Sequence, residues 1–186
     1  MKSTKIEQLR TIKIHSAPNM CTFCCMEMLL KYLRIEYEHI QKKLPQFSHC
    51  TGVQDILLQY VEGKTKVGNR RICDLTDAVN DLNLGVRVIR KYVNDDNKKN
   101  GIFITREQIE QYIDKWDLIC VNLYTGPKYD IGHSNILHAY DPDMQYFNVI
   151  DPVDKNKKTL SFSEFENKWI DISVPYSELF YIDCKV

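Results

Sequence analysis

The hydrophobic positions of the first half of the chain recur at helical spacing, whereas many in the second half alternate as they do in strands. Four segments of the first half predict helices, at residues 21–33, 35–44, 52–61 and 73–82. The period changes at residues 85–93, whose alternation predicts a strand, and the polar run 94–101 predicts an exposed loop. Helices followed by antiparallel strands predict an α+β fold.

The second half contains further strand signals and two helical segments. The predicted elements are a helix at 106–116, a strand at 118–124, a β-hairpin at 132–152, a helix at 161–170 and a strand at 178–184. The hairpin turn is predicted at Asp141, Pro142 and Asp143. The chain has 186 residues, no internal repeat and no long linker, so we expect a single domain spanning residues 1–186.

The charge balance limits the classes of partner. Lys plus Arg and Asp plus Glu each number 25, so the chain has no basic excess that would attract nucleic acid or an anionic membrane surface. The first residues lack the apolar run of a signal peptide, and no later run reaches the length of a membrane span. We therefore expect a protein that is cytoplasmic, or exported without a classical signal peptide. The sequence does not indicate an oligomeric state.

Three of the seven cysteines lie between residues 21 and 25, at the start of the first predicted helix. An odd number of cysteines in a chain without a predicted signal peptide favours free thiols over a disulfide framework. Asn19 is predicted as the N-cap, which puts Cys21 in the first turn, where the helix dipole favours a thiolate. The cysteines that lie inside apolar periodic stretches are expected to be packing residues: Cys24, Cys25, Cys73, Cys120 and Cys184.

The predicted hairpin brings a histidine and a carboxylate together. If the turn is centred on residue 142, His133 lies opposite Asp151, and His138 lies opposite Tyr146 on the other face. A carboxylate that holds an imidazole N–H supplies two members of a nucleophile-activating triad, and Cys21 would be the third. A slip of one residue at the turn would separate His133 from Asp151.

Three motifs resemble papain-like cysteine peptidases of the bacteriocin-leader-processing, or double-glycine, type. They are CTFCCMEMLLKY at Cys21, GHSNILHAYD at His133 and NVIDP at Asp151, and the resemblance covers about residues 14 to 182. It implies a papain-like fold in which a helical part packs on an antiparallel sheet, with the site in the cleft between them. It also implies that Cys21, His133 and Asp151 cleave a peptide or protein substrate through a thioester, without a metal or other cofactor.

The sequence departs from that family pattern beside the nucleophile. Thr22 stands where the family commonly has glycine, and the position six residues before Cys21, where the family's oxyanion-hole glutamine would stand, does not hold a glutamine. His15, which stands six residues before Cys21, and Asn19 are the side-chain candidates for that role, together with the backbone N–H of Cys21.

Other interpretations remain open at this stage. The same triad could pass its acyl group to an amine, as an acyltransferase, or the chain could be a catalytically impaired relative that binds peptides. Cys21 could also be a small buried core residue. A zinc site built from Cys21, Cys24, His49 and Cys50 has suitable ligand types, but its spacing fits no common zinc-finger pattern.

Overall fold

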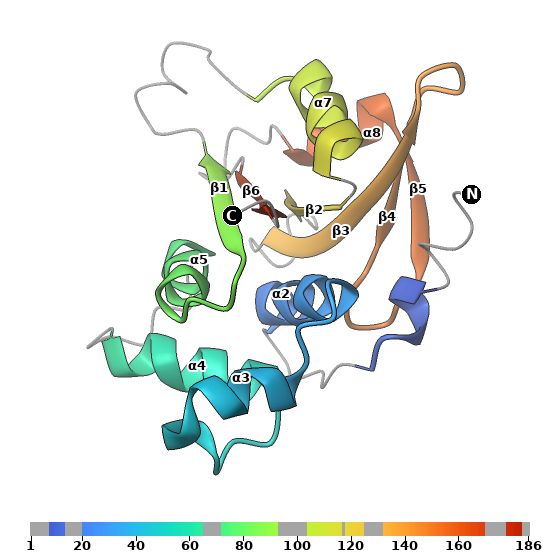
Figure 1. Cartoon of the computed structure of the whole chain (residues 1–186). Coiled ribbons are helices and arrows are strands. Elements are labelled where there is room, and N and C mark those ends of the chain that lie inside the picture. The colour runs from blue at the N-terminus through green and yellow to red at the C-terminus, as the bar shows by residue number, and fades with distance from the viewer. Residues whose placement is uncertain are drawn as a thin grey trace. The chain divides into compact units, whose positions relative to one another are not determined.

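The computed structural model describes residues 8–13, 20–64, 72–92, 104–116, 118–124, 132–169 and 178–183. These residues form two compact units, whose elements are labelled in Figure 1. A mainly helical unit comprises the described residues up to Val88 together with Ile182 and Asp183. A second unit comprises the described residues from Ile89 to Tyr181. We call the first the helical unit and the second the sheet unit.

The first unit is built from the predicted helices. They are α2 (Cys21–Tyr32), α3 (Tyr37–Lys43), α4 (Val53–Lys64) and α5 (Ile72–Asp81), with a short 3-10 helix, η1 (Pro45–Phe47), after α3. Helix α4 contacts both α2 and α5 (Figure 1). The predicted helices are confirmed, but the predicted cap of α2 is wrong by one residue, because Met20 rather than Asn19 occupies the N-cap position and provides no side-chain cap.

A buried polar cluster fixes α2 against α4. Glu27 of α2 is only 3% exposed, and its carboxylate accepts a hydrogen bond from Gln54 Nε2 at 2.5 Å and pairs with Lys31 Nζ at 2.7 Å. The Cys24 thiol donates to Gln54 Oε1 at 3.7 Å. A buried carboxylate is tolerated when its oxygens are paired, so these contacts fix the orientation of the helix that begins at Cys21.

The strands form one sheet with the order β1-β6-β2-β3-β4-β5. Their bounds are β1 (Arg87–Tyr92), β2 (Ile119–Tyr124), β3 (Gly132–Asp141), β4 (Tyr146–Ile150), β5 (Lys157–Ser161) and β6 (Glu178–Asp183). Neighbouring strands from β6 to β5 pair in antiparallel fashion. The α+β arrangement predicted from the sequence is therefore confirmed.

Helices α7 (Arg106–Trp116) and α8 (Phe162–Trp169) cover one face of this sheet, which we call the α7/α8 face. Phe147 of β4 lies in its core, with ring centroids 4.8 Å from Phe162 and 4.5 Å from Phe165. Leu137 of β3 and Val149 of β4 belong to the same core and mark the side-chain positions that point to this face. Among the described residues, no helix is long and apolar enough to cross a membrane.

Strand β5 was not predicted. Its sequence, KKTLS, has three exposed residues followed by two that are half-buried, so it lacks the alternation of a strand with one buried face. It is the last strand in the sheet order and pairs with β4, with Lys158 opposite Val149. Lysines on an edge strand also discourage pairing with other chains.

The register of the β3–β4 hairpin differs from the prediction. The turn comprises four residues, 142–145, and Asp141 rather than His138 lies opposite Tyr146. Asp141 and Asp143 are turn residues as predicted, because Asp141 Oδ1 accepts the N–H of Asp143 at 3.1 Å. His138 is an extra residue in a β-bulge, since Leu137 pairs with Val149 while Ala139 pairs with Asn148. The predicted pairing of His138 with Tyr146 is therefore wrong.

Candidate active site

His133 and Asp151 form the predicted contact at one end of the α7/α8 face. His133 Nε2 lies 2.8 Å from Asp151 Oδ2, and 26% of the His133 side chain is exposed against 9% of the Asp151 side chain. On β3, His133 has the same strand parity as Leu137, and Leu123 of β2 lies opposite it. Two strands therefore hold His133 in place, and part of its side chain is exposed to solvent.

The bulge at His138 places the side chains of His133 and Asp151 on the same face of the sheet. Uninterrupted pairing from Tyr140 and Phe147 would set Asp151 opposite Ile136, which points away from the face that carries His133. With the bulge, Ile136 pairs with Ile150, and the next position brings Asp151 opposite Asn135. Asn135 and His133 share a face, so Asp151 is a diagonal neighbour of His133 rather than its direct partner.

The backbone around Asp151 immobilises its carboxylate. Its N–H donates to Asn156 O at 3.1 Å, and its carbonyl accepts the N–H of Lys155 at 2.9 Å. Oδ1 accepts the N–H of Val153 at 2.9 Å. The turn after β4 therefore fixes one carboxylate oxygen and leaves Oδ2 for contacts with other side chains.

Lys158 of β5 shares that second oxygen, and sequence reasoning did not identify it. Its Nζ lies 3.3 Å from Asp151 Oδ2, and 48% of its side chain is exposed. The signal that could have revealed it is the parity of the β4–β5 hairpin, because Lys158 pairs with Val149, two residues before Asp151. The sequence alone does not give this parity, because its hydrophobic pattern does not predict β5.

The surroundings of Asp151 favour its ionised form. Burial raises the pKa of its carboxyl, but hydrogen bonds from His133 and the Val153 N–H, the charge of His133 and the hydrogen bond from Lys158 outweigh burial. The resulting pKa lies well below the ordinary value of an aspartate. Asp151 therefore remains an anionic acceptor for the imidazole throughout the neutral range.

This lowered pKa predicts a loss of stability in acid. A carboxyl whose pKa is lower in the folded state stabilises the fold above its unfolded-state value of about 4, and this contribution disappears as the pH falls further. We expect Asp151→Asn to cost on the order of 2 kcal/mol in the free energy of unfolding at pH 7 and about 1 kcal/mol less at pH 3, because pH 3 lies below the unfolded-state pKa but still above the lowered folded-state pKa. Urea unfolding at both pH values measures this, with the exposed turn residue Asp143→Asn as the matched control. An equal cost of Asp151→Asn at the two pH values would contradict it.

Cys21 is the first residue of α2 and is half-buried. The first turn of α2 contains no acidic residue, so no side-chain charge there opposes the stabilisation of a thiolate by the helix dipole. Cys21 belongs to the helical unit, whereas His133 and Asp151 belong to the sheet unit. The structure brings His133 and Asp151 together, and the pairing of Cys21 with His133 stays a prediction.

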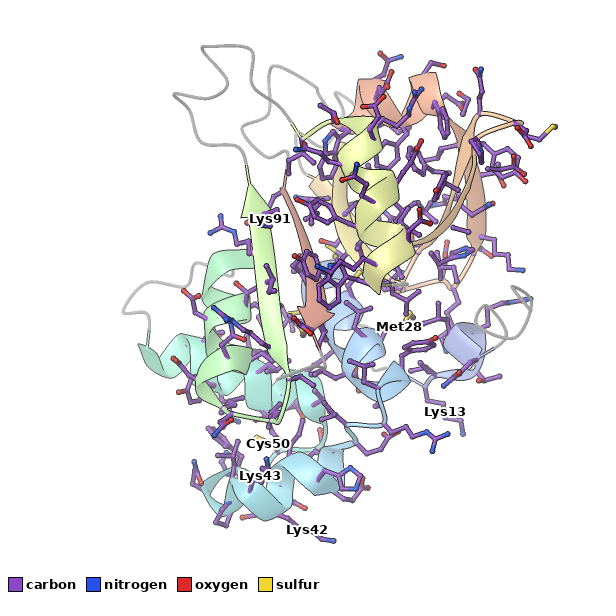
Figure 2. The ribbon with its side chains drawn as sticks, turned by 45° about the horizontal axis from the view of Figure 1, so that its top comes forward. Lys13, Met28, Lys42, Lys43, Cys50 and Lys91 are labelled. Atoms are coloured by element: carbon purple, nitrogen blue, oxygen red, sulfur yellow. The ribbon has the colours of Figure 1, made fainter. Side chains whose placement is uncertain are left out.

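Most of the other cysteines that the structure describes are packing residues, as predicted. Cys24, Cys25 and Cys120 are at most 1% exposed. The side chain of Cys73 and all of Cys184 lie outside the described residues. Cys50, labelled in Figure 2, is buried, and burial followed by the charge of Asp55 raises the pKa of its thiol. A raised pKa makes Cys50 a poor nucleophile.

The residues of the alternative zinc site make other contacts. His49 Nε2 lies 2.7 Å from Gln59 Oε1, and Cys24 contacts Gln54. Within the described ranges, no three His, Cys, Asp or Glu side chains are grouped as metal ligands would be.

Both side-chain candidates for the oxyanion site, His15 and Asn19, lie outside the described residues. Thr22, which replaces the glycine common in the resembling family, is the second residue of α2 and is half-buried. The composition of the oxyanion site therefore stays a prediction.

The sequence profile of the Peptidase C39 like family matches residues 4–175, which include Cys21, His133 and Asp151. The chain belongs to this family. Membership of the Peptidase C39 like family indicates a cysteine peptidase type of function. No curated protein shows significant sequence similarity to this chain.

Two solved structures are similar to this chain. The peptidase domain of Streptococcus ComA, a bi-functional ABC transporter involved in a quorum sensing pathway, superposes with a TM-score of 0.53 at 11% identity, covering 90% of this chain and 93% of that domain. The N-terminal peptidase C39 like domain of the toxin secretion ATP-binding protein from Vibrio parahaemolyticus gives a TM-score of 0.35 at 8% identity, covering 80% of this chain and 96% of that domain. The first of these likenesses and the family match establish the papain-like α+β fold.

Proposed function

We propose that this chain is a cysteine peptidase in which Cys21 is the nucleophile, His133 the general base and acid, and Asp151 the residue that orients His133. The observation that carries the proposal is the 2.8 Å contact between His133 Nε2 and a carboxylate that the backbone holds in place. The position of Cys21 in the first turn of α2 and the family match support it.

The contact with Asp151 decides which nitrogen of His133 does the chemistry. Because Nε2 faces the carboxylate, Nε2 carries the proton in the neutral ring, and Nδ1 is the nitrogen that accepts the thiol proton. The resulting imidazolium is stabilised by the anionic Asp151. Cys21 then carries the negative charge as a thiolate at the positive end of α2.

The reaction then proceeds by acyl transfer. The thiolate attacks a peptide carbonyl carbon, forming a tetrahedral oxyanion whose collapse breaks the C–N bond, and His133 Nδ1 gives its proton to the departing amine. Water attacks the thioester while His133 accepts its proton, and the acid product leaves as Cys21 is regenerated. The backbone N–H of Cys21 is a donor for the oxyanion in this scheme.

We propose a peptide or protein as the substrate, because the activity proposed for this chain is the cleavage of a peptide bond. The test is incubation with a mixed library of synthetic peptides, acid quenching, and mass spectrometry of both the peptides and the protein. We expect new peptide termini and an acyl adduct on the peptide that contains Cys21. The Cys50→Ala variant should behave as the wild type, because that thiol lies outside the proposed site.

The outcomes separate the interpretations. An adduct that is released only by an added amine would replace the peptidase with the acyltransferase alternative. The absence of both cleavage and adduct, from a protein shown to be folded by circular dichroism, would contradict the proposed activity.

A further inference from the structure

Lys158 places a positive charge beside the His133–Asp151 pair, and a minimal Cys-His-Asp triad has no counterpart of this residue. Asp151 Oδ2 is approached by His133 Nε2 at 2.8 Å and by Lys158 Nζ at 3.3 Å. Oδ1 is already used by the Val153 N–H. Two groups that are positively charged when protonated therefore share one carboxylate oxygen.

We propose that Lys158 is a positioning residue that acts through Asp151 to limit how strongly the carboxylate favours the imidazolium form of His133. Its role in catalysis rests on the proposed function, whereas its electrostatic effect on His133 rests only on the sheet unit. All three residues belong to that unit, and adjacent strands fix their places.

The sheet pleat directs Lys158 to this position. Lys158 lies opposite Val149, whose side chain points to the α7/α8 face, and Asp151 follows Val149 by two residues. Lys157, the preceding residue, has the opposite strand parity and lies opposite Ile150. The chain therefore offers two neighbouring lysines of which only one is aimed at Asp151.

The exposure of Lys158 favours an electrostatic role over a stabilising one. With 48% of its side chain exposed, its ion pair is screened by water and adds little to folding stability. The same charge still repels a protonated imidazole bound to the same oxygen, and it reduces the attraction that Asp151 exerts on that imidazole. Lys158 thus shifts His133 towards its neutral form, which can accept a proton.

In the described part of the unit, the elements packed around His133 present neutral groups and charged groups with assigned contacts of their own. Strand β2 presents Leu123 opposite His133, and Asn135 is neutral and donates to the His133 carbonyl. Asp154 and Lys155 lie in the turn between β4 and β5, where the Asp154 carboxylate accepts the N–H of Asn156. Four acidic groups on the covering helices have assigned partners: Glu107 and Glu110 of α7 pair with Arg106, Asp114 of α7 accepts from Tyr140, and Glu164 of α8 accepts from Ser161.

The test measures the protonation of His133 directly, by NMR titration of its ring resonances. The titration uses the full chain carrying Cys21→Ser, so that no thiol titrates with the histidine, and the resonance is assigned by its loss in His133→Gln. Lys158→Met removes the charge and keeps an unbranched apolar stem, Lys158→Arg keeps the charge, and Lys157→Met removes an equal charge from the same strand.

We expect Lys158→Met to raise the pKa of His133, so that the ratio of imidazolium to neutral imidazole at a fixed pH rises about threefold. Lys158→Arg should retain the wild-type titration, and Lys157→Met should change it much less. No change in Lys158→Met, or equal changes in Lys158→Met and Lys157→Met, would overturn the proposal. A response of His133 to Lys158, together with a folded wild-type chain that cleaves no peptide, would overturn the proposed function and leave this inference standing.

Discussion

Replacing Cys21 with alanine is expected to reduce peptide cleavage by on the order of 10⁶-fold. The reason is chemical, because alanine cannot form the thioester and His133 would have no thiol to deprotonate. Alanine is compatible with the first turn of α2, and Cys21 is only half-buried, so the fold should persist. The measurement is kcat/KM on whichever peptide the wild type cleaves best.

The matched control for this variant is Cys50→Ala. Cys50 is a buried thiol of the same unit, burial raises the pKa of that thiol, and it is not one of the three proposed catalytic residues. We expect Cys50→Ala to keep the wild-type kcat/KM. Comparable losses in the two variants would mean that the Cys21 effect is structural, and full activity in Cys21→Ala would place the nucleophile elsewhere.

Replacing His133 with glutamine is expected to lower kcat/KM by about 10⁴-fold. Glutamine can still contact Asp151, but it cannot accept the thiol proton or return it to the leaving amine. We expect KM to change little relative to kcat, because the lost interactions belong to proton transfer in the transition state.

An exposed histidine of the helical unit provides the comparison. His49→Gln removes an imidazole that contacts Gln59, and it should leave kcat/KM unchanged. If His133→Gln and His49→Gln had the same small effect, His133 would not be the base. If His133→Gln raised KM alone, the residue would serve substrate binding.

The fold could largely be predicted from the sequence because most elements bury one continuous stripe or face. Helix α7 was predicted at its observed bounds, 106–116, where Ile109 and Ile113 recur at helical spacing and both pack in the core. Strand β5 could not be predicted, because its residues are exposed at the edge and its stability comes from pairing with β4. Hydrophobic periodicity gives no signal for a strand of this kind.

The contact between His133 and Asp151 was predicted from a register that proved wrong by two residues. A longer turn displaced the register by an odd number, and the bulge at His138 restored the parity, so both side chains still share a face. Turn length and bulges depend on local backbone conformation, such as the positive φ of Gln145, which a hydrophobic pattern does not report. Lys158 was missed for the related reason that its strand was missed.

The central claim is that His133 activates Cys21, and the most direct test is the rate at which iodoacetamide alkylates Cys21 as a function of pH. Mass spectrometry locates the label, and the buried thiols Cys24 and Cys25 serve as internal references. An ordinary cysteine ionises only near pH 8.5, so rapid labelling of Cys21 at about pH 6 would show a stabilised thiolate. We predict that result for the wild type, with a fall of at least about tenfold at pH 6 in His133→Gln. Labelling of Cys21 that follows an ordinary thiol in the wild type, or the same pH profile in both proteins, would contradict the account.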